Sequence, residues 1–314
     1  MSAAYRPGLS TPSVAPPQDQ TVVLAHSSAS SPKQWTTLAA ALPPTIAPGA
    51  ITLVGHGAEP VWGGERALTV AEEAKAIEAT ARDARIHLVG HSYGGAVALR
   101  FALAHPEQLR SLTLIEPSCF HVLARDAEHQ PLLKEVETLV ARLNAGVIAG
   151  DYRRAMALFV EYWNGVGAWD AAPEHRKASL AAKAILVAHH FSRLLGDDWP
   201  LSALEAIKAP VLILCGDRSP KPSRAITRTL AEAIPQARHR TIRGAGHMAP
   251  ITHPEAVNPL IVEHLERSAA HQASATDPSA ILGNPTDGAV VARRVGALCV
   301  RPESVARREK RKTP

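Results

Sequence analysis

The turn around Ser92 constrains the fold of this chain more than any other stretch. The segment IHLVGHSYGGAVALRFALAHP changes character in its middle. Its first part, Ile86–Val89, is a short apolar run typical of a buried strand, and Tyr93–His105 is an Ala-rich run typical of a helix that ends before Pro106. The chain therefore has to pass directly from a strand into a helix at a single serine flanked by glycines.

The pattern G-x-S-x-G at this turn has a mechanical reason. A turn this tight forces its central residue into a sparsely allowed backbone region, and neighbours without a Cβ atom relieve the crowding. The hydroxyl of Ser92 is then held above the sheet at the N-terminus of the next helix, as in a nucleophile elbow. The stretch predicts a reactive serine, which needs partner residues from elsewhere in the chain.

Expected strands and helices alternate along much of the chain, and the strands are continuously apolar. This pattern is typical of a parallel sheet covered by helices on both faces, so the predicted fold class is α/β. The expected strands are Thr21–His26, Ile51–Gly57, Ile86–Val89, Ser111–Pro117, Ala209–Asp217 and Ala237–Arg243. The expected helices are Lys33–Leu42, Leu68–Asp83, Tyr93–His105, Ser223–Ile234 and about Pro254–Arg267, the last kinked or delayed by Pro259.

The alternation stops after residue 117, where the sequence predicts helices alone, at about Leu132–Asn144, Tyr152–Trp163 and Pro173–Leu195. An all-helical insertion between two strands is expected to form a cap. The two ends of the chain lack a hydrophobic pattern and are expected to be disordered. The predicted organisation is a disordered segment at 1–20, an α/β core at 21–117 and 205–268, a helical cap at 118–204, and a disordered basic tail at 269–314.

Composition limits the possible classes of function. The 314 residues contain no run of 18 apolar residues and no apolar signal-peptide region at the start, so neither a membrane span nor secretion is expected. The net charge is +5, but residues 269–314 contribute +4 of it, so specific nucleic-acid binding is not expected. Three cysteines without metal or disulfide spacing favour a cytoplasmic location: Cys119, Cys215 and Cys299.

A reactive serine needs a base, and His247 is the best-placed of the 15 histidines. It lies in the stretch IRGAGHMAPITHPE, in a Gly-rich loop between the last expected strand and the last helix. Loops at the carboxyl edge of a parallel sheet converge, so this loop can reach Ser92 across 155 residues of sequence. The other candidates are interpreted as helix-start, packing or surface residues: His56, His91, His189, His190 and His253.

Taken together, these motifs resemble the α/β-hydrolase superfamily over about Thr21–Arg267. The resemblance rests on GHSYGG, GAGHMAP, VVLAHSSAS after the first expected strand, and VLILCGDRSP before the position of the usual acid. It implies an α/β-hydrolase fold, with a mostly parallel sheet, an inserted helical cap, and the first two family strands missing or very short. It also implies that His247 takes the proton of Ser92 as the serine attacks a carbonyl group.

The resemblance further implies two backbone donors for the oxyanion that forms during this attack. One is the N–H of Tyr93, at the start of the helix after the serine. The family usually carries His-Gly after the first strand and donates from the next residue, which here is Ser28. This chain has His26-Ser27 in place of His-Gly. The loss of the glycine is a departure that can reshape the oxyanion loop.

The largest departure from the family pattern is at the position where the acid of the triad is expected. Its usual position is the fourth of G-x-x-D, which here is Ser219, and a serine cannot carry the charge that an imidazolium requires. Two carboxylates can replace it. Glu116 follows the strand before the cap, and some family members place the acid there. Asp217 lies on the usual strand, two residues early. Glu116 is the preferred candidate and Asp217 is the second.

The sequence therefore predicts a serine hydrolase of the carboxylesterase type. It is expected to cleave a small ester or related carbonyl substrate through an acyl-enzyme, without a cofactor or a metal. Perhydrolase, C–C hydrolase and acyltransferase chemistry use the same site and stay open. A different class is also open, a non-enzymatic small-molecule receptor that retains the fold. The expected partner is a small-molecule substrate, with no membrane and no specific nucleic acid, and the sequence is silent on the oligomeric state.

Overall fold

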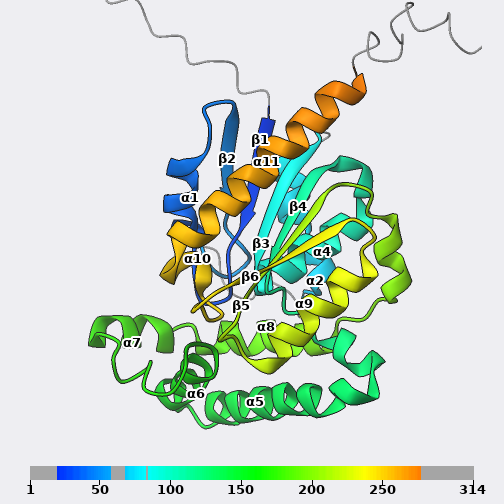
Figure 1. Cartoon of the computed structure of the whole chain (residues 1–314). Helices are drawn as coiled ribbons and strands as arrows, with labels where there is room; N and C mark the ends of the chain where they lie inside the picture. Colours follow the sequence, from blue (N-terminus) through cyan, green and yellow to red (C-terminus); the bar gives the residue numbers. More distant parts are fainter. Residues whose placement is uncertain (1–19, 58–67, 83, 277–314) are drawn as a thin grey trace, which may run out of the picture. The chain divides into compact units, whose positions relative to one another are not determined.

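One parallel sheet forms the centre of the computed structural model, which describes residues 20–57, 68–82 and 84–276 (Figure 1). The strands lie in the order β2-β1-β3-β4-β5-β6, and every neighbouring pair is parallel. Their carboxyl ends therefore share one edge, and the strand order reverses between β1 and β3, where ligand sites of such sheets form. The strands are β1 (Gln20–Ala25), β2 (Ile46–Ile51), β3 (Ile86–His91), β4 (Leu109–Ile115), β5 (Val211–Gly216) and β6 (Ala237–Ile242).

Helices pack on both faces of this sheet, as the apolar strands predicted. One face is covered by η1 (Pro32–Trp35), α1 (Thr36–Ala41), α10 (Ala249–Thr252) and α11 (Pro254–Thr276). The opposite face is covered by α2 (Val70–Glu73), α3 (Lys75–Ala81), α4 (Tyr93–Ala104) and α9 (Lys221–Ala233).

Side chains of β1 alternate between these two layers. Val22 and Leu24 belong to the cluster under α1 and α11, whereas Val23 and Ala25 belong to the cluster under α4. All four are fully buried. Burial of each larger side chain stabilises the fold by about 1.5–3 kcal/mol, so the two layers hold the strand ends, and the loops that follow them, in place.

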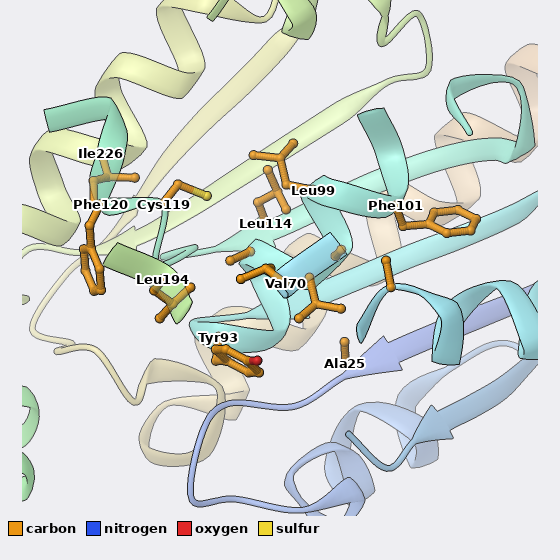
Figure 2. Close-up of a cluster of buried hydrophobic side chains, with 14 of the residues drawn as sticks. Ala25, Val70, Tyr93, Leu99, Phe101, Leu114, Cys119, Phe120, Leu194 and Ile226 are labelled. Carbon is orange, nitrogen blue, oxygen red and sulfur yellow. The ribbon is translucent and has the colours of Figure 1, made fainter. Parts of the chain in front are cut away.

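Residues 118–206 leave the sheet and form the cap, whose helices lie across the carboxyl ends of the strands (Figure 1). Phe120 and Leu194 of this region join the same buried cluster as Leu99 and Leu114 of the core (Figure 2). The cap is therefore packed into the core. Its elements are η3 (Phe120–Arg125), η4 (Ala127–His129), α5 (Gln130–Ile148), α6 (Tyr152–Asn164), α7 (Glu174–Ala181), α8 (Ala184–Gly196) and η5 (Leu201–Ala206).

The second strand differs from the sequence prediction. It was expected at Ile51–Gly57, but β2 ends at Ile51 and includes Pro48 and Gly49. Both residues disfavour strands, yet β2 is an edge strand, where a proline needs no partner for the N–H that it lacks. The apolar run beyond β2 is instead a loop in which Leu53 is buried and donates its N–H to Nε2 of His26 at 3.3 Å.

The last cap helix was expected to be continuous over Pro173–Leu195, but it is interrupted between α7 and α8. Lys183 lies at the break, and its Nζ donates to the backbone carbonyls of Ala29 and Ser30 at 2.9 and 3.2 Å. These acceptors belong to the loop after β1. The break thus accompanies a contact between distant parts of the chain, which the local helix pattern cannot reveal.

The final helix is longer than predicted. α11 continues through Pro259 to Thr276, so residues 269–276 are helical where the sequence predicted disorder. The prediction required an apolar periodic face, but the segment is rich in alanine, and good helix formers can extend a helix without one. The remaining parts of the predicted disordered ends, 1–19 and 277–314, lie outside the described residues.

Candidate active site

Ser92 lies at the turn between β3 and α4 in a strained backbone conformation. Its φ of 55° and ψ of −118° belong to a region that residues with side chains rarely adopt. Its N–H donates to the carbonyl of Ile115 at 2.9 Å, which ties the turn to β4. A Cβ on Gly90 would lie 2.5 Å from the carbonyl oxygen of Gly94, and a Cβ on Gly94 would collide with the carbonyl of His26. The flanking glycines are therefore required for the turn that presents the Ser92 hydroxyl.

His247 lies in the loop between β6 and α10 and is 3% exposed. Its Nε2 is 2.9 Å from Oγ of Ser92, and its Nδ1 is 2.7 Å from Oε2 of Glu116. Because Nδ1–H donates to the carboxylate, Nε2 is left to accept the hydroxyl proton of Ser92. The indole of Trp163 from α6 packs against the imidazole with ring centroids 4.3 Å apart. The imidazole of His247 is thus held in one orientation and covered by α6.

Glu116 comes directly after β4 and is 1% exposed, with a positive φ of 43°. Besides the bond to His247, its carboxylate accepts hydrogen bonds from the N–H of Gly216 at 2.8 Å and from Oγ of Ser219 at 2.5 Å. Burial by itself would raise the pKa of Glu116, but the hydrogen bond and charge of His247, together with the two other donors, hold that pKa below its usual value. The carboxyl group is therefore ionised opposite the imidazole.

Asp217, the second candidate acid, is not brought to His247. It is exposed, and its Oδ1 accepts the N–H of Gly244 at 2.8 Å, which links the end of β5 to the loop after β6. Ser219, at the usual position of the acid, donates its hydroxyl to Glu116. The carboxylate that faces His247 thus comes from the neighbouring strand, and the serine supports it.

The two expected oxyanion donors belong to segments that border Ser92. Tyr93 is the first residue of α4, and N–H groups at the first turn of a helix have no acceptor within that helix. Ser28 lies in the loop after β1 and lines the same cavity as Ser92 and His247. The two residues therefore lie on segments that follow the neighbouring strands β1 and β3, between which the strand order reverses.

A buried chain of hydrogen bonds that the sequence did not reveal starts at Ser27. The N–H and the hydroxyl of Ser27 both donate to Oε1 of Gln34, at 3.1 and 2.9 Å. Nε2 of Gln34 donates to Nδ1 of His91 at 3.0 Å, and Nε2 of His91 donates to the backbone carbonyl of His247 at 2.8 Å. Ser27, the residue that replaces the family glycine, is thus connected to the loop that carries His247.

The cap holds the same loop from the other side. Oγ of Ser28 is hydrogen-bonded to Nδ1 of His190 on α8 at 2.9 Å, and Lys183 binds the two carbonyls that follow. Ala29, which supplies the first of these two carbonyls, has a positive φ of 59°. His91 and His190 are buried, in agreement with the packing interpretation, and they also make hydrogen bonds that this interpretation did not include. Their polar role depends on partners distant in sequence, so no local motif could have indicated it.

Burial keeps the histidines beneath the site neutral. It is the main cause that lowers the pKa of His91 to about 3, with repulsion from His247 adding to it. Burial likewise lowers the pKa of His26 to about 4. His26 donates from Nδ1 to the carbonyl of Ser27 at 2.8 Å and accepts at Nε2, as a neutral ring must. At neutral pH the rings of His26 and His91 therefore act in the site as uncharged hydrogen-bonding groups, and the carboxylate of Glu116 carries a negative charge there.

A cavity of about 350 Å³ opens beside Ser92 between the core and the cap. Serines and His247 line its core side, and mostly apolar side chains of α6, α7 and the segment between them line its cap side. Within the described residues, no three His, Cys, Asp or Glu side chains are arranged to hold a metal ion. Over the same residues, each helix is too short or too polar to traverse a lipid bilayer.

Two sequence relatives illustrate what the chain is similar to. It is 28% identical over 215 residues to a Pantoea ananatis protein provisionally named carbamate hydrolase RutD, covering 67% of this chain and 74% of that protein. It is also 28% identical over 249 residues to the pimeloyl-[acyl-carrier protein] methyl ester esterase of Aeromonas hydrophila, covering 76% of this chain and 92% of that esterase.

Solved structures agree with the fold. A hydrolase from Pseudomonas aeruginosa superposes with a TM-score of 0.64 at 24% identity, covering 78% of this chain and 89% of that chain. The pattern of the alpha/beta hydrolase family matches residues 22–260, which include most of β1, the other five strands and the cap. On this match, the chain belongs to the alpha/beta hydrolase family.

Proposed function

We propose that this protein is a cofactor-independent serine hydrolase that cleaves a small ester or related carbonyl substrate through an acyl-enzyme. One observation carries the proposal. The imidazole of His247 bridges the hydroxyl of Ser92 and the buried carboxylate of Glu116, at 2.9 and 2.7 Å. Membership of the alpha/beta hydrolase family, and relatives named as a hydrolase and an esterase, support hydrolase activity.

In the first half of the reaction, Oγ of Ser92 attacks the carbonyl carbon of the ester while Nε2 of His247 takes the hydroxyl proton. The carbonyl oxygen becomes an oxyanion, and the N–H groups of Ser28 and Tyr93 are assigned as its donors. The imidazolium then gives its proton to the oxygen of the departing alcohol. The acyl group stays on Ser92 as an ester.

In the second half, His247 takes a proton from a water molecule that attacks the acyl-enzyme, and returns that proton to Oγ of Ser92 as the acid leaves. Glu116 holds the imidazole in the tautomer that the first step needs and stabilises the imidazolium through its charge. Asp217 has no part in these steps. The proposed reaction needs neither a metal nor a cofactor.

The proposed division of labour follows the predicted domains. Residues 21–117 and 205–268 carry the reacting groups, and residues 118–204 cover them and shape the cavity. The proposed partner is a small-molecule substrate. Perhydrolase and acyltransferase reactions would use the same serine and histidine with another nucleophile in place of water, and a C–C hydrolase would use water to cleave a carbon–carbon bond. A cytoplasmic location stays a prediction of the sequence.

A fluorophosphonate probe tests the proposal, because it forms a covalent bond only with an activated serine. We expect the wild-type protein to be labelled and to hydrolyse p-nitrophenyl esters, and we expect Ser92→Ala to lose both properties. Ser118→Ala is the matched control. Oγ of Ser118 is buried 3.3 Å from Oγ of Ser92, so it is the serine that a non-specific probe would reach next. This control should stay labelled.

If the probe still labels Ser92→Ala but does not label Ser118→Ala, the nucleophile is Ser118, and the proposed role of Ser92 is wrong. No labelling of the folded wild-type protein would favour the receptor alternative over an enzyme.

A further inference from the structure

We propose that the substrate is an ester with a short aliphatic acyl group and a polar alcohol, and that the two parts occupy separate compartments on either side of His247. This inference rests on the proposed function and identifies its substrate class. It is carried by two hollows that meet at His247 and Trp163 and differ in the residues that line them.

The first compartment is the acyl cavity, the hollow of about 350 Å³ beside Ser92. Apolar side chains line much of its wall, among them Phe159 from α6, Leu180 from α7 and Ile251 from α10. Asn164 and the exposed Arg176 also line it. Its size is at the lower end of ordinary ligand sites. A hydrocarbon chain gains free energy against these apolar side chains by leaving water. The cavity therefore suits a short aliphatic chain.

The second compartment is the alcohol cleft, a hollow of about 590 Å³ between the cap and the loops after β5 and β6. Arg218 lines it from the core, and Glu135 and Tyr162 line it from the cap. Both charged side chains are exposed, and the carboxylate of Glu135 accepts the Tyr162 hydroxyl at 2.8 Å. Donors and acceptors of both kinds therefore border the cleft, and they suit an alcohol that carries further hydroxyl groups.

The chemistry assigns each part of the ester to one compartment. The acyl carbon becomes bonded to Ser92, which lines the acyl cavity and is not among the described residues that border the cleft. The departing oxygen must receive its proton from Nε2 of His247. The residue His247 lines both hollows. Trp163 lines both as well and packs against the imidazole. The alcohol therefore leaves past His247, into the cleft.

Two substitutions reduce one compartment each. Ala171→Trp adds an indole at an exposed alanine that lines the acyl cavity alone. Gly246→Leu adds a side chain to the wall of the cleft alone, and a Cβ at Gly246 would meet no atom within 4 Å. The backbone of Gly246 does not have the positive φ that only glycine accepts readily. Both variants are therefore expected to fold, and their melting temperatures check this.

The experiment measures kcat/KM for four substrates, the methyl and glyceryl esters of acetic and of hexanoic acid. We expect Ala171→Trp to reduce activity on both hexanoates by about tenfold or more relative to both acetates, with either alcohol. We expect Gly246→Leu to reduce activity on both glyceryl esters relative to both methyl esters by a similar factor, with either acid.

The reverse pattern, in which Ala171→Trp selects by alcohol and Gly246→Leu by acid, would overturn the assignment. Unchanged selectivity in both folded variants would overturn it as well. Leu180→Trp and Arg218→Trp repeat the test from other walls of the same compartments if either first variant does not fold. The absence of any hydrolysis that depends on Ser92 would refute the proposed function itself, and this outcome is distinct from altered or unaltered selectivity.

Discussion

The sheet edge and the cap side of the cavity differ in the polarity of their side chains. At the sheet edge, polar side chains are buried and bonded to each other: Ser27, Gln34, His91, Glu116 and His247. On the cap side, the wall of the cavity is mostly apolar, and no residue of α7 is buried. The sheet edge holds dipoles and charge in fixed orientations before a substrate binds, whereas the cap side determines the shape of the cavity.

This difference separates two properties of the proposed enzyme. Rate depends on groups that are held in place without reorganisation, so it belongs to the buried network at the sheet edge. Selectivity depends on space and on exposed side chains, so it belongs to the cap and the cleft. The separation is incomplete, because Lys183 and His190 of the cap bind the loop that carries Ser28.

The largest expected effect tests which strand supplies the acid. Glu116→Gln keeps the shape of the side chain but removes the charge opposite His247, so kcat should fall on the order of 10³ to 10⁴. Asp217→Asn is the matched control, because among the described residues this exposed carboxylate accepts the backbone N–H of Gly244 and is not bonded to His247. It should change kcat by less than about twofold. Ester hydrolysis by both purified variants, with circular dichroism as a check of folding, decides the matter.

A comparable loss in Asp217→Asn alone would assign the acid to the other strand. Full activity in both variants would mean that Ser92 and His247 act without an acid.

A smaller effect is expected from the buried network. Gln34→Leu leaves two donors of Ser27 and Nδ1 of His91 without partners, so the loop after β1 should lose its fixed position. The N–H donors themselves remain, so kcat should fall by about 10- to 100-fold, which is less than the loss of a whole donor commonly costs. The fall should be the same for all four esters, because the cap is untouched.

Gln236→Leu is the control for this variant. Gln236 is part-buried and its amide donates to the carbonyls of Ile207 and Ala209, at positions that do not line the cavity or the cleft. Its loss should lower the melting temperature and leave kcat unchanged. A Gln34→Leu variant that altered selectivity among the esters instead of kcat would contradict the separation of rate from shape.

The smallest expected effect is a loss of folding stability at low pH, caused by a buried histidine. Burial lowers the pKa of His87 to about 3, whereas the same residue in the unfolded chain takes up its proton near pH 6.5. The unfolded state therefore binds more protons below pH 6.5, and stability falls as the pH drops from 6.5 towards 3. His87→Gln should remove this contribution, about 1 kcal/mol at pH 6.

Urea unfolding of the wild type and of His87→Gln at pH 7.5 and pH 6 measures the difference. The ring of His87 is bonded to Ser111 and Gln20, away from the cavity, so kcat at pH 7.5 should be unchanged. An identical loss of stability with acid in both proteins would show that other groups cause it.

The sequence alone determined the features that depend on neighbouring residues. Apolar runs alternating with helical segments indicated a parallel sheet, and the glycines around Ser92 indicated a sharp turn, because backbone sterics act over a few residues. The predicted parallel sheet was enough to place Ser92 and His247 at the same edge, because loops after parallel strands converge there. It also left two carboxylates, Glu116 and Asp217, as candidates for a single position.

Only the tertiary structure decided what depends on contacts between distant residues. Glu116 faces His247 because β4 ends beside β5, where Gly216 and Ser219 donate to its carboxylate, and no local pattern records where two strands end relative to each other. The chain of bonds from Ser27 to His247 likewise joins residues more than 200 positions apart. Burial is a property of the packed molecule, and burial turned these ordinary polar residues into a connected network around the serine.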